Sequence, residues 1–524
     1  MPPPSPDYLW QPDDHAWTRD THLARFMRTR GVVSLAELRQ ASVHCFQWFW
    51  DEALRDIGLE WRPRYTHLRD VSRGLAWTRW FTGGGINVTH NCIDRHVRDG
   101  HGADIALVLV AADHGGAPRR VNFGLLADLV DRCALALRAA GVQRGDHVAA
   151  AGRSSLPEVV AMFATLKLGA RFVPLGHVRP EAWKGCLARC EARAVFAGPV
   201  AERGVQGTDT LAVLREMAAE LPALTCIVGT EGAEWDGFLQ SGGCVVPGRD
   251  VFVRRQRPTL DPEPTHAEEP CLVLFAGDGP EEPAGLVHTH AGCLAQAGRD
   301  FFYAFDVRPG EPVFWPELIG GPMLPWMLIG CLMHRAPVVL DEVLPAPAGV
   351  ERLWRLSAEL GVATFGASPE LVRGLRAARE EGPGRYDLGR LRLLASAGGG
   401  WNKADSHWFA TVAGGGRCPV IQTVGGPAMF GGVAQTYPLE PIRAGAVGGP
   451  ALGIDAAVVT DEGKPAPPGA TGNLVCLQPA PAMTRSYLRD DGRYFETHFQ
   501  RFPGAWDERR RVRVEADGQW FEET

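Results

Sequence analysis

A glycine-rich loop follows a strand-like run in residues 272–292, LVLFAGDGPEEPAGLVHTHAG. Glycines at such a point let backbone N–H groups approach phosphate oxygens, and working phosphate loops add hydroxyls and a lysine. Between the strand-like run and Gly285 this loop has no Ser, Thr or Lys, and it carries Asp278, Glu281 and Glu282 instead. The residue types therefore predict a loop that keeps the shape of a phosphate cradle without its chemistry.

Two histidines directly after the loop, His288 and His290, are the candidates for acid–base catalysis. A histidine beside carboxylates can act as a general base, and the acidic residues of the loop are near in sequence. The alternative is structural: both histidines belong to the framework, and the acidic residues form a solvated turn between Pro280 and Pro283. No nucleophilic serine is indicated, because GASPE (366–370) lacks the glycine pair of a nucleophile elbow.

Cysteine spacing gives no metal site. The chain has 12 cysteines and no CxxC pair. Cys186 and Cys190 stand four apart, which could place two thiols on one helix face, but no histidine pair is near them. We therefore predict that they lie in the core and that the chain has no metal site.

Composition excludes several classes of partner. The 524 residues carry a net charge of −7, with 45% hydrophobic and 22% charged residues, which gives no basic footprint for nucleic acid. The start, MPPPSPDYLW, is no secretory signal. The longest apolar run, GGPMLPWMLIGCLMH, holds a proline and is short for a membrane span. We predict a cytoplasmic protein, in a bacterial metabolic or biosynthetic pathway, with neither nucleic-acid nor membrane partners.

Strands and helices alternate along most of the chain, which predicts an α/β fold with mainly parallel sheets. One series begins near residue 103, and a second covers residues 338–400. From about residue 440, Gly/Pro turns separate short alternating strands, typical of a smaller β-rich unit. Residues 35–58 have helical patterning, and residues 201–268 give the weakest signal.

Dispersed motifs, in order from about residue 17 to residue 521, then resemble those of one known family. They include WFTGGGINVTHNCIDRH (80–96), LWRLSAELGVATFGASPELVRGL, ALGIDAAVVTDEGKPAPPGATGNLV and RYFETHFQRFPGAW (493–506). The chain resembles the large N-terminal part of an acyl-CoA synthetase of the adenylate-forming (ANL) superfamily, in the acetyl- and acetoacetyl-CoA synthetase branch.

The resemblance implies a large domain of two α/β subdomains and a distorted β-barrel. In the family a small C-terminal domain with the catalytic lysine follows, and we expect it to be absent because the chain stops at DGQWFEET. The expected division is an N-terminal extension (1–100), a first α/β subdomain (101–270), a second one with the loop (271–435) and a β-barrel-like subdomain (436–524).

The family reaction joins a carboxylate to AMP from ATP, with Mg²⁺, and then transfers the acyl group to coenzyme A. It needs donors around the triphosphate, a metal ligand and a hold on the ribose. The family loop maps onto this one with every hydroxyl missing and the two lysines replaced by Glu282 and Ala284. The aligned loop positions include Ala276, Gly277, Asp278, Gly279, Glu282, Ala284 and Gly285.

Three further nucleotide contacts also differ from the family pattern. The adenine-contacting motif becomes Gly398, Gly399 and Gly400, and the threonine–acid pair that holds Mg²⁺ becomes Pro427 and Ala428. Arg510 stands where the family has its ribose-binding aspartate. We therefore expect that ATP and Mg²⁺ are not bound, and we predict no cofactor.

Other aligned positions concern the acyl group and the scaffold. In the family, the segment FWPELIGGPMLPWMLIG helps to line the acyl tunnel; the alternative here is core packing. Asp94, Arg95 and His96 look catalytic, but the resemblance assigns them to the scaffold as a structural ion pair. The acyl-pocket candidates are Trp315, Met323, Trp326, Val424 and Gly425.

Three functional hypotheses follow. In the first, the protein has lost adenylation and binds an acyl or carboxylate ligand, coenzyme A, a carrier protein or a partner enzyme. In the second, the old acyl pocket serves a reaction that needs no ATP, with His288 or His290 as acid–base groups. In the third, the protein is a genuine ligase completed by a separate C-terminal domain.

Overall fold

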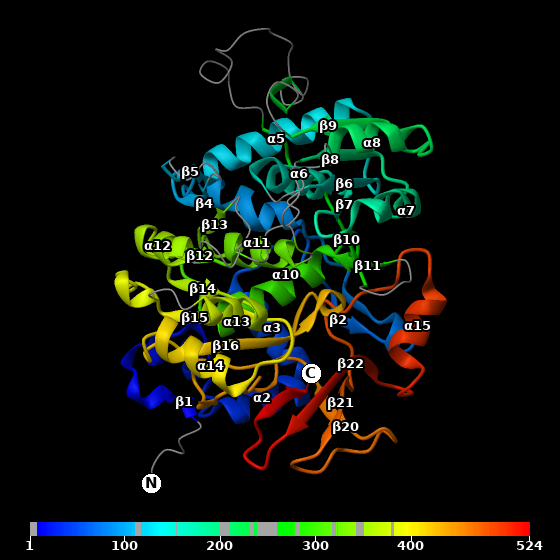
Figure 1. Ribbon diagram of the computed structural model, residues 1–524. Helices are drawn as coiled ribbons and strands as arrows, with labels where there is room; N and C mark the ends of the chain where they lie inside the picture. The colour runs from blue at the N-terminus through cyan, green and yellow to red at the C-terminus, as the bar shows by residue number, and fades with distance from the viewer. Residues whose placement is uncertain are drawn as a thin grey trace.

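The structure is a computed structural model (Figure 1). It describes residues 8–110, 117–152, 155–198, 210–230, 235–237, 259–277, 283–316, 321, 323–341, 351–378 and 382–523. The expected α/β fold is confirmed, with two large, mainly parallel sheets.

The first sheet has six strands in the order β11-β10-β7-β6-β8-β9. Its central strands are parallel, and β11 returns antiparallel to β10. Because β10 pairs with β7 (Leu272 opposite Phe172) and β11 pairs with β10, residues 270–276 and 284–289 belong to this sheet. The expected boundary at 270/271 therefore separates strands that the sheet joins. The strands are β6 (His147–Ala151), β7 (Arg171–Pro174), β8 (Ala194–Ala197), β9 (Cys226–Gly229), β10 (Pro270–Ala276) and β11 (Ala284–Thr289).

The second sheet has nine strands in the order β19-β17-β16-β15-β14-β12-β13-β4-β5. Six neighbouring strands, β16 to β4 in that order, are parallel, and both edges are antiparallel. Residues 105–110 and 119–122 thus join this sheet, although the sequence places them with the first subdomain. The strands are β4 (Ile105–Val110), β5 (Arg119–Asn122), β12 (Val313–Phe314), β13 (Val338–Asp341), β14 (Thr364–Gly366), β15 (Leu393–Ala397), β16 (Val420–Gly426), β17 (Gly431–Gln435) and β19 (Gly449–Pro450).

Helices cover both sheets, as α/β layering requires (Figure 1). One buried core joins residues of α5, α6, α10 and α11, and a second lies under α12 and α13. From Glu158 to Lys167 every residue of α6 is buried. The helices are α5 (Phe123–Ala139), α6 (Leu156–Lys167), α7 (Pro180–Cys190), α8 (Thr210–Ala218), α10 (His290–Arg299), α11 (Leu324–Met333), α12 (Glu351–Glu359), α13 (Pro369–Ala377) and α14 (Lys403–Trp408).

The C-terminal part is an antiparallel four-stranded sheet, β20-β21-β22-β23, where the sequence predicts a β-rich unit. A main-chain bridge between Gly448 and Trp520 connects it to the segment before β19. Trp520 N donates to Gly448 O at 2.7 Å. Its elements are β20 (Ala456–Val459), β21 (Thr471–Cys476), α15 (Asp491–Phe499), β22 (Trp506–Val514) and β23 (Trp520–Glu523).

The N-terminal segment forms helices, but the helical pattern predicted over 35–58 breaks at Cys45, where the backbone leaves the helical conformation. Thr21 and Ser34 accept backbone N–H groups as N-caps, and Gly58 ends the last helix in the left-handed conformation. These elements are α1 (His22–Arg30), α2 (Leu35–His44), α3 (Phe46–Ile57), α4 (Arg95–Arg98), and the short pairs β1 (Tyr8–Trp10) with β18 (Ile442–Arg443) and β2 (His67–Asp70) with β3 (Arg79–Thr82).

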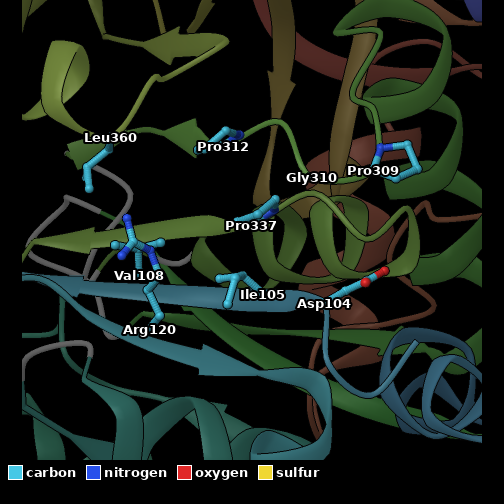
Figure 2. A pocket seen from close by; sticks show the side chains of 9 residues that line it. All are labelled: Asp104, Ile105, Val108, Arg120, Pro309, Gly310, Pro312, Pro337 and Leu360. Atoms are coloured by element: carbon cyan, nitrogen blue, oxygen red, sulfur yellow. The ribbon is translucent and has the colours of Figure 1, made fainter. Parts of the chain in front are cut away.

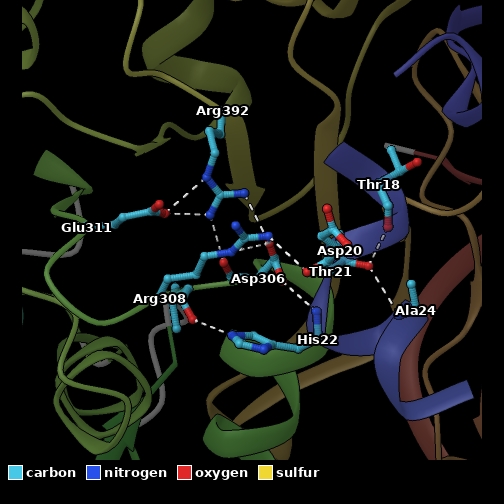
Figure 3. Close-up of polar contacts among 10 residues, drawn as sticks. Thr18, Asp20, Thr21, His22, Ala24, Asp306, Arg308, Glu311 and Arg392 are labelled. Atoms are coloured by element: carbon cyan, nitrogen blue, oxygen red, sulfur yellow. Dashed lines mark hydrogen bonds and ion pairs between the residues drawn. The ribbon is translucent and has the colours of Figure 1, made fainter. Parts of the chain in front are cut away.

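A buried carboxylate attaches α1 to the second sheet (Figure 3). Asp306 Oδ1 accepts His22 N at 2.8 Å, and its Oδ2 accepts Arg308 Nη2 at 2.8 Å and Arg392 Nη1 at 3.0 Å. Glu311 holds the same Arg392 guanidinium from the other side, with Nη2 at 2.6 Å from Oε2. The network therefore joins three chain segments that are distant in sequence.

Among the helices that the structure describes, none combines the length and the apolar character needed to cross a membrane.

Candidate nucleotide cleft

Two of the nucleotide positions aligned from the sequence, Gly398 and Arg510, meet the acyl-pocket candidate Gly425 at the carboxyl ends of strands in the nine-stranded sheet. Gly398 follows the end of β15, Gly425 lies near the end of neighbouring β16, and Arg510 reaches them from β22. Arg510 Nη2 donates to Gly425 O at 2.9 Å. Since ligands of open α/β sheets bind at the carboxyl ends of the strands, this convergence defines the candidate cleft.

The floor of the cleft is glycine-rich for a steric reason. Gly398 has φ 97°, a left-handed conformation that favours glycine. A Cβ on Gly425 would lie 2.0 Å from Gly431 O, so no side chain fits there. A Cβ on Gly399 would stand 3.8 Å from Glu522 Oε1 and 4.0 Å from Arg510 Nη1. The two charged side chains therefore lie directly over the floor.

Arg510 and Glu522 form an ion pair in this position. Arg510 Nη1 donates to Glu522 Oε1, and only 7% of the Glu522 side chain is exposed, against 28% for Arg510. Glu522 Oε2 is buried and has no hydrogen-bond partner among the described residues. The arginine is thus engaged by a carboxylate and a carbonyl of its own chain, in the place where the resemblance expects an aspartate that binds ribose.

The position expected to hold Mg²⁺ has no carboxylate. Pro427 and Ala428 lie in a short 3₁₀ turn (Pro427–Met429), and Ala428 O accepts Thr484 N at 2.7 Å. No group of three or more His, Cys, Asp or Glu suited to a metal is found in the described part of the chain. Mg²⁺ prefers carboxylate and water oxygens, so the residues at this position do not fit it.

The glycine loop connects two antiparallel strands, β10 and β11. Phe275 faces Gly285 and Ala276 faces Ala284 in the register, and Gly277 has φ 141°. Gly285 O accepts Leu488 N at 2.7 Å, which attaches the loop base to the C-terminal part. The remaining loop positions, Asp278, Gly279 and Glu282 with Pro280 and Glu281, lie outside the described residues.

Comparison with known proteins identifies the fold and the family. The family model described as "AMP-binding enzyme" matches residues 94–488, and "Acetyl-coenzyme A synthetase N-terminus" matches residues 35–92. The chain belongs to the AMP-binding enzyme family.

Several relatives of this AMP-binding family member are acetyl-coenzyme A synthetases. An acetyl-coenzyme A synthetase of Streptomyces avermitilis is 31% identical over 477 residues, covering 87% of this chain and 70% of that protein. One from Allorhizobium ampelinum is 29% identical, covering 90% and 73%. A solved acetoacetyl-CoA synthetase from Streptomyces lividans has a TM-score of 0.84 at 22% identity, covering 99% of this chain and 80% of that one, which is a likeness of fold.

The two candidate histidines lie in the interior of this AMP-binding fold. His288 is 1% exposed and His290 is 0% exposed. His288 Nδ1 lies 3.0 Å from Ala482 O, and His290 Nδ1 accepts Val88 N at 3.3 Å. Burial lowers the pKa of each to about 4, so both are neutral at physiological pH. The surroundings match the structural alternative for these residues, and their catalytic role stays a prediction.

The acyl-pocket candidates do not all share one environment. Trp315 and Trp326 are buried and meet edge-on, with ring centroids 5.9 Å apart. Trp326 Nε1 donates to Asp300 Oδ2 at 3.1 Å. These contacts are those of core packing. Val424 is also buried, Met323 packs partly buried against the same core, and Gly425 lies on the cleft floor.

The scaffold triplet pairs with other residues rather than within itself. Asp94 Oδ1 accepts Lys167 Nζ at 2.9 Å, and His96 Nε2 lies 3.0 Å from Leu332 O. Arg95 Nη2 donates to Met333 O at 2.7 Å. The expected ion pair therefore involves the buried Lys167, and all three side chains connect helices of the core.

The predicted placement of the two cysteines also agrees with the structure. Cys186 and Cys190 are 3% and 0% exposed on α7. Burial raises the pKa of Cys190 to about 12.

Sequence reasoning missed Glu522. Val512 faces Glu522 across the β22–β23 hairpin, so Arg510 is a diagonal neighbour of Glu522 on the same face. The turn signal was the sequence EADG (515–518), from which this register could have been inferred.

Proposed function

We propose that this chain has lost ATP-dependent adenylation and acts by binding an acyl-type carboxylate, coenzyme A or a carrier protein, alone or together with a partner enzyme. The observation that carries the proposal is the Arg510–Glu522 pair over Gly399. A ribose would have to displace a guanidinium that already has two partners, and no carboxylate is then available at position 510 to accept its hydroxyls.

Electrostatics supports the same conclusion. A triphosphate attracts cations and a bound Mg²⁺, but Ala428 offers no metal ligand, and the loop has Glu282 and Ala284 where the resemblance expects two lysines. Two unit charges about 4 Å apart at an effective dielectric of about 20 interact by roughly 4 kcal/mol. Replacing attraction by repulsion of this size weakens nucleotide binding severely.

The decisive experiment is ATP–pyrophosphate exchange with acetate and acetoacetate, with the Streptomyces avermitilis acetyl-coenzyme A synthetase as positive control. We expect exchange by the relative and none by this chain. Exchange that disappears in Gly399→Trp, a change that fills the cleft floor, would overturn the proposal. Binding is measured separately: acetoacetate and coenzyme A are each titrated by calorimetry into the parent chain and into Gly399→Trp, and the two affinities are compared.

A second candidate is acyl-CoA synthesis itself, with a separate C-terminal domain completing the site. It is favoured by the family match over residues 94–488 and by 31% identity to an acetyl-coenzyme A synthetase. The exchange assay separates the two candidates, because adenylation precedes transfer to coenzyme A. An ATP-independent reaction at His288 gains no support from its burial; turnover lost in His288→Ala would establish it.

A further inference from the structure

A cavity (Figure 2) lies at the amino ends of parallel strands of the nine-stranded sheet, and we call it the amino-edge cavity. Ile105 begins β4, Pro312 and Pro337 immediately precede β12 and β13, and Leu360 precedes β14. All four positions are at the amino ends of parallel strands, whereas Gly398 and Gly425 lie at carboxyl ends. The cavity has a volume of about 420 Å³, which is within the range of small-molecule sites.

The walls of this amino-edge cavity are apolar and rigid. Proline rings have a fixed φ and no N–H group, and three of them line the cavity together with Ile105, Val108 and Leu360. The carbonyls of the wall are already used: Pro312 O accepts Ala363 N at 3.0 Å, and Pro337 O accepts Val313 N at 2.8 Å. The wall therefore suits the apolar part of a ligand and offers that ligand few hydrogen bonds.

The lining contains two charged side chains, and they differ in what they can offer a ligand. Asp104 Oδ2 already accepts Arg335 Nη1 at 2.7 Å and lies 3.4 Å from His101 Nδ1. Arg120, on β5, is exposed and has no hydrogen bond or ion pair within the part of the chain that the structure describes. It stands opposite Val108 in the β4–β5 register, so its side chain lies on the cavity face of the strand.

We propose that the amino-edge cavity binds a small amphipathic anion, with its apolar body against the proline walls and its single anionic head on the Arg120 guanidinium. A neutral ligand would leave the arginine unused, and a cationic one would be repelled by it. This site is separate from the candidate cleft and does not depend on whether the chain adenylates.

The chain supplies a matched control. Arg119 is adjacent to Arg120, and neighbouring residues of a strand point to opposite faces, so Arg119→Gln makes the same charge change away from the cavity. Ile105→Trp, at a half-buried wall position, reduces the cavity volume without changing charge.

The test uses one apolar body with three heads: octanoate, 1-octanol and octylammonium, titrated into the full chain by calorimetry. We expect octanoate to bind more tightly than the other two. Arg120→Gln should weaken octanoate about fivefold, as loss of an exposed ion pair does, Arg119→Gln should leave its Kd unchanged, and Ile105→Trp should abolish binding.

Hydrogen exchange locates the site. Octanoate should protect the main chain of 104–110 and 307–313, and leave 396–400 and 423–432 unchanged. Equal weakening by Arg119→Gln and Arg120→Gln, equal binding of octanoate and octylammonium, no saturable binding of octanoate, or protection confined to the cleft segments would each overturn the proposal.

Discussion

Arg510 and Glu522 illustrate, at the residue scale, how two side chains can change what a cleft accepts. Arg510 donates to Glu522 Oε1, and Gly425 O accepts a further hydrogen bond from the arginine. Breaking a mostly buried pair leaves one charge without compensation, whereas replacing both partners by neutral groups of similar shape is much less costly. The pair therefore has a stability signature that can be measured separately from ligand binding.

We predict that Arg510→Met lowers the apparent free energy of unfolding in urea by about 1–3 kcal/mol, because Glu522 is left buried without its cation. The double variant Arg510→Met/Glu522→Gln should recover most of that loss. Exposed Arg73→Met provides the control for a simple loss of charge. Equal losses in the single and double variants would contradict the role of the pair.

His288 gives a prediction about pH. Its pKa in the folded chain is about 4, below the ordinary value of 6.5, so the folded state holds the neutral form. Its contribution to stability is complete above pH 6.5 and is lost as pH falls towards 4, because the unfolded chain binds the proton first.

In His288→Gln the slope of unfolding free energy against pH between 6.5 and 4 should decrease by up to about 1.4 kcal/mol per pH unit, which corresponds to one proton. Urea unfolding at several pH values measures the slope. A slope unaltered by His288→Gln would show that this histidine titrates alike in both states.

At the element scale, the Asp306 network decides how α1 is held. Asp306 has a fully buried side chain and a positive φ of 44°. It receives donors from α1, from its own loop and from Arg392, which immediately precedes β15. Because these groups come from separate segments, the carboxylate acts as their common acceptor.

We predict that Asp306→Ala destabilises the chain by about 3–5 kcal/mol, since buried donors lose their acceptor. Limited proteolysis should then cleave first within residues 15–34. Asp306→Asn should have a smaller effect, because asparagine tolerates a positive φ and keeps one acceptor oxygen. Exposed Asp14→Ala is the control, and a proteolysis pattern identical to the parent would contradict the attachment.

At the scale of the whole molecule, the nine-stranded sheet separates two candidate sites, which lie at opposite ends of its parallel strands. The cleft with the Arg510–Glu522 pair lies at the carboxyl ends of the parallel strands, and the cavity beside Arg120 lies at their amino ends. A ligand that binds only the folded state raises the unfolding temperature, because it stabilises that state by RT ln(1 + [L]/Kd). Thermal unfolding therefore reports on each site without an activity assay.

We predict that MgATP at about 5 mM raises the unfolding midpoint of this chain by less than about 1 °C, while it stabilises the Streptomyces avermitilis relative measurably. The physical reason is the occupied ribose position and the missing metal ligand. A rise of the unfolding midpoint that grows with MgATP concentration and is removed by Gly399→Trp would contradict the loss of nucleotide binding. Octanoate, tested in the same thermal unfolding measurement, is the contrasting ligand for the cavity beside Arg120.

The sequence by itself determined the fold class, the family and the positions that meet in the cleft. Local patterns suffice for this, because glycines, strand runs and motif order depend on nearby residues. Set against the family resemblance, it also predicted which hydroxyls, lysines and acids differ at the nucleotide positions. Pairing of β10 with the first sheet and of β4 with the second was not predictable in this way, since strand partners are set by contacts between residues far apart in sequence.

Only the tertiary structure decided what surrounds each candidate. The sequence places His288 beside an acidic loop, but packing against the C-terminal part buries it and keeps it neutral. Arg510 looked like a simple mismatch until the β22–β23 hairpin placed Glu522 beside it. Likewise the cavity at Arg120 is assembled from five separate segments. Burial and charge pairing are properties of neighbours in space, so they follow from the folded chain rather than from any single stretch of it.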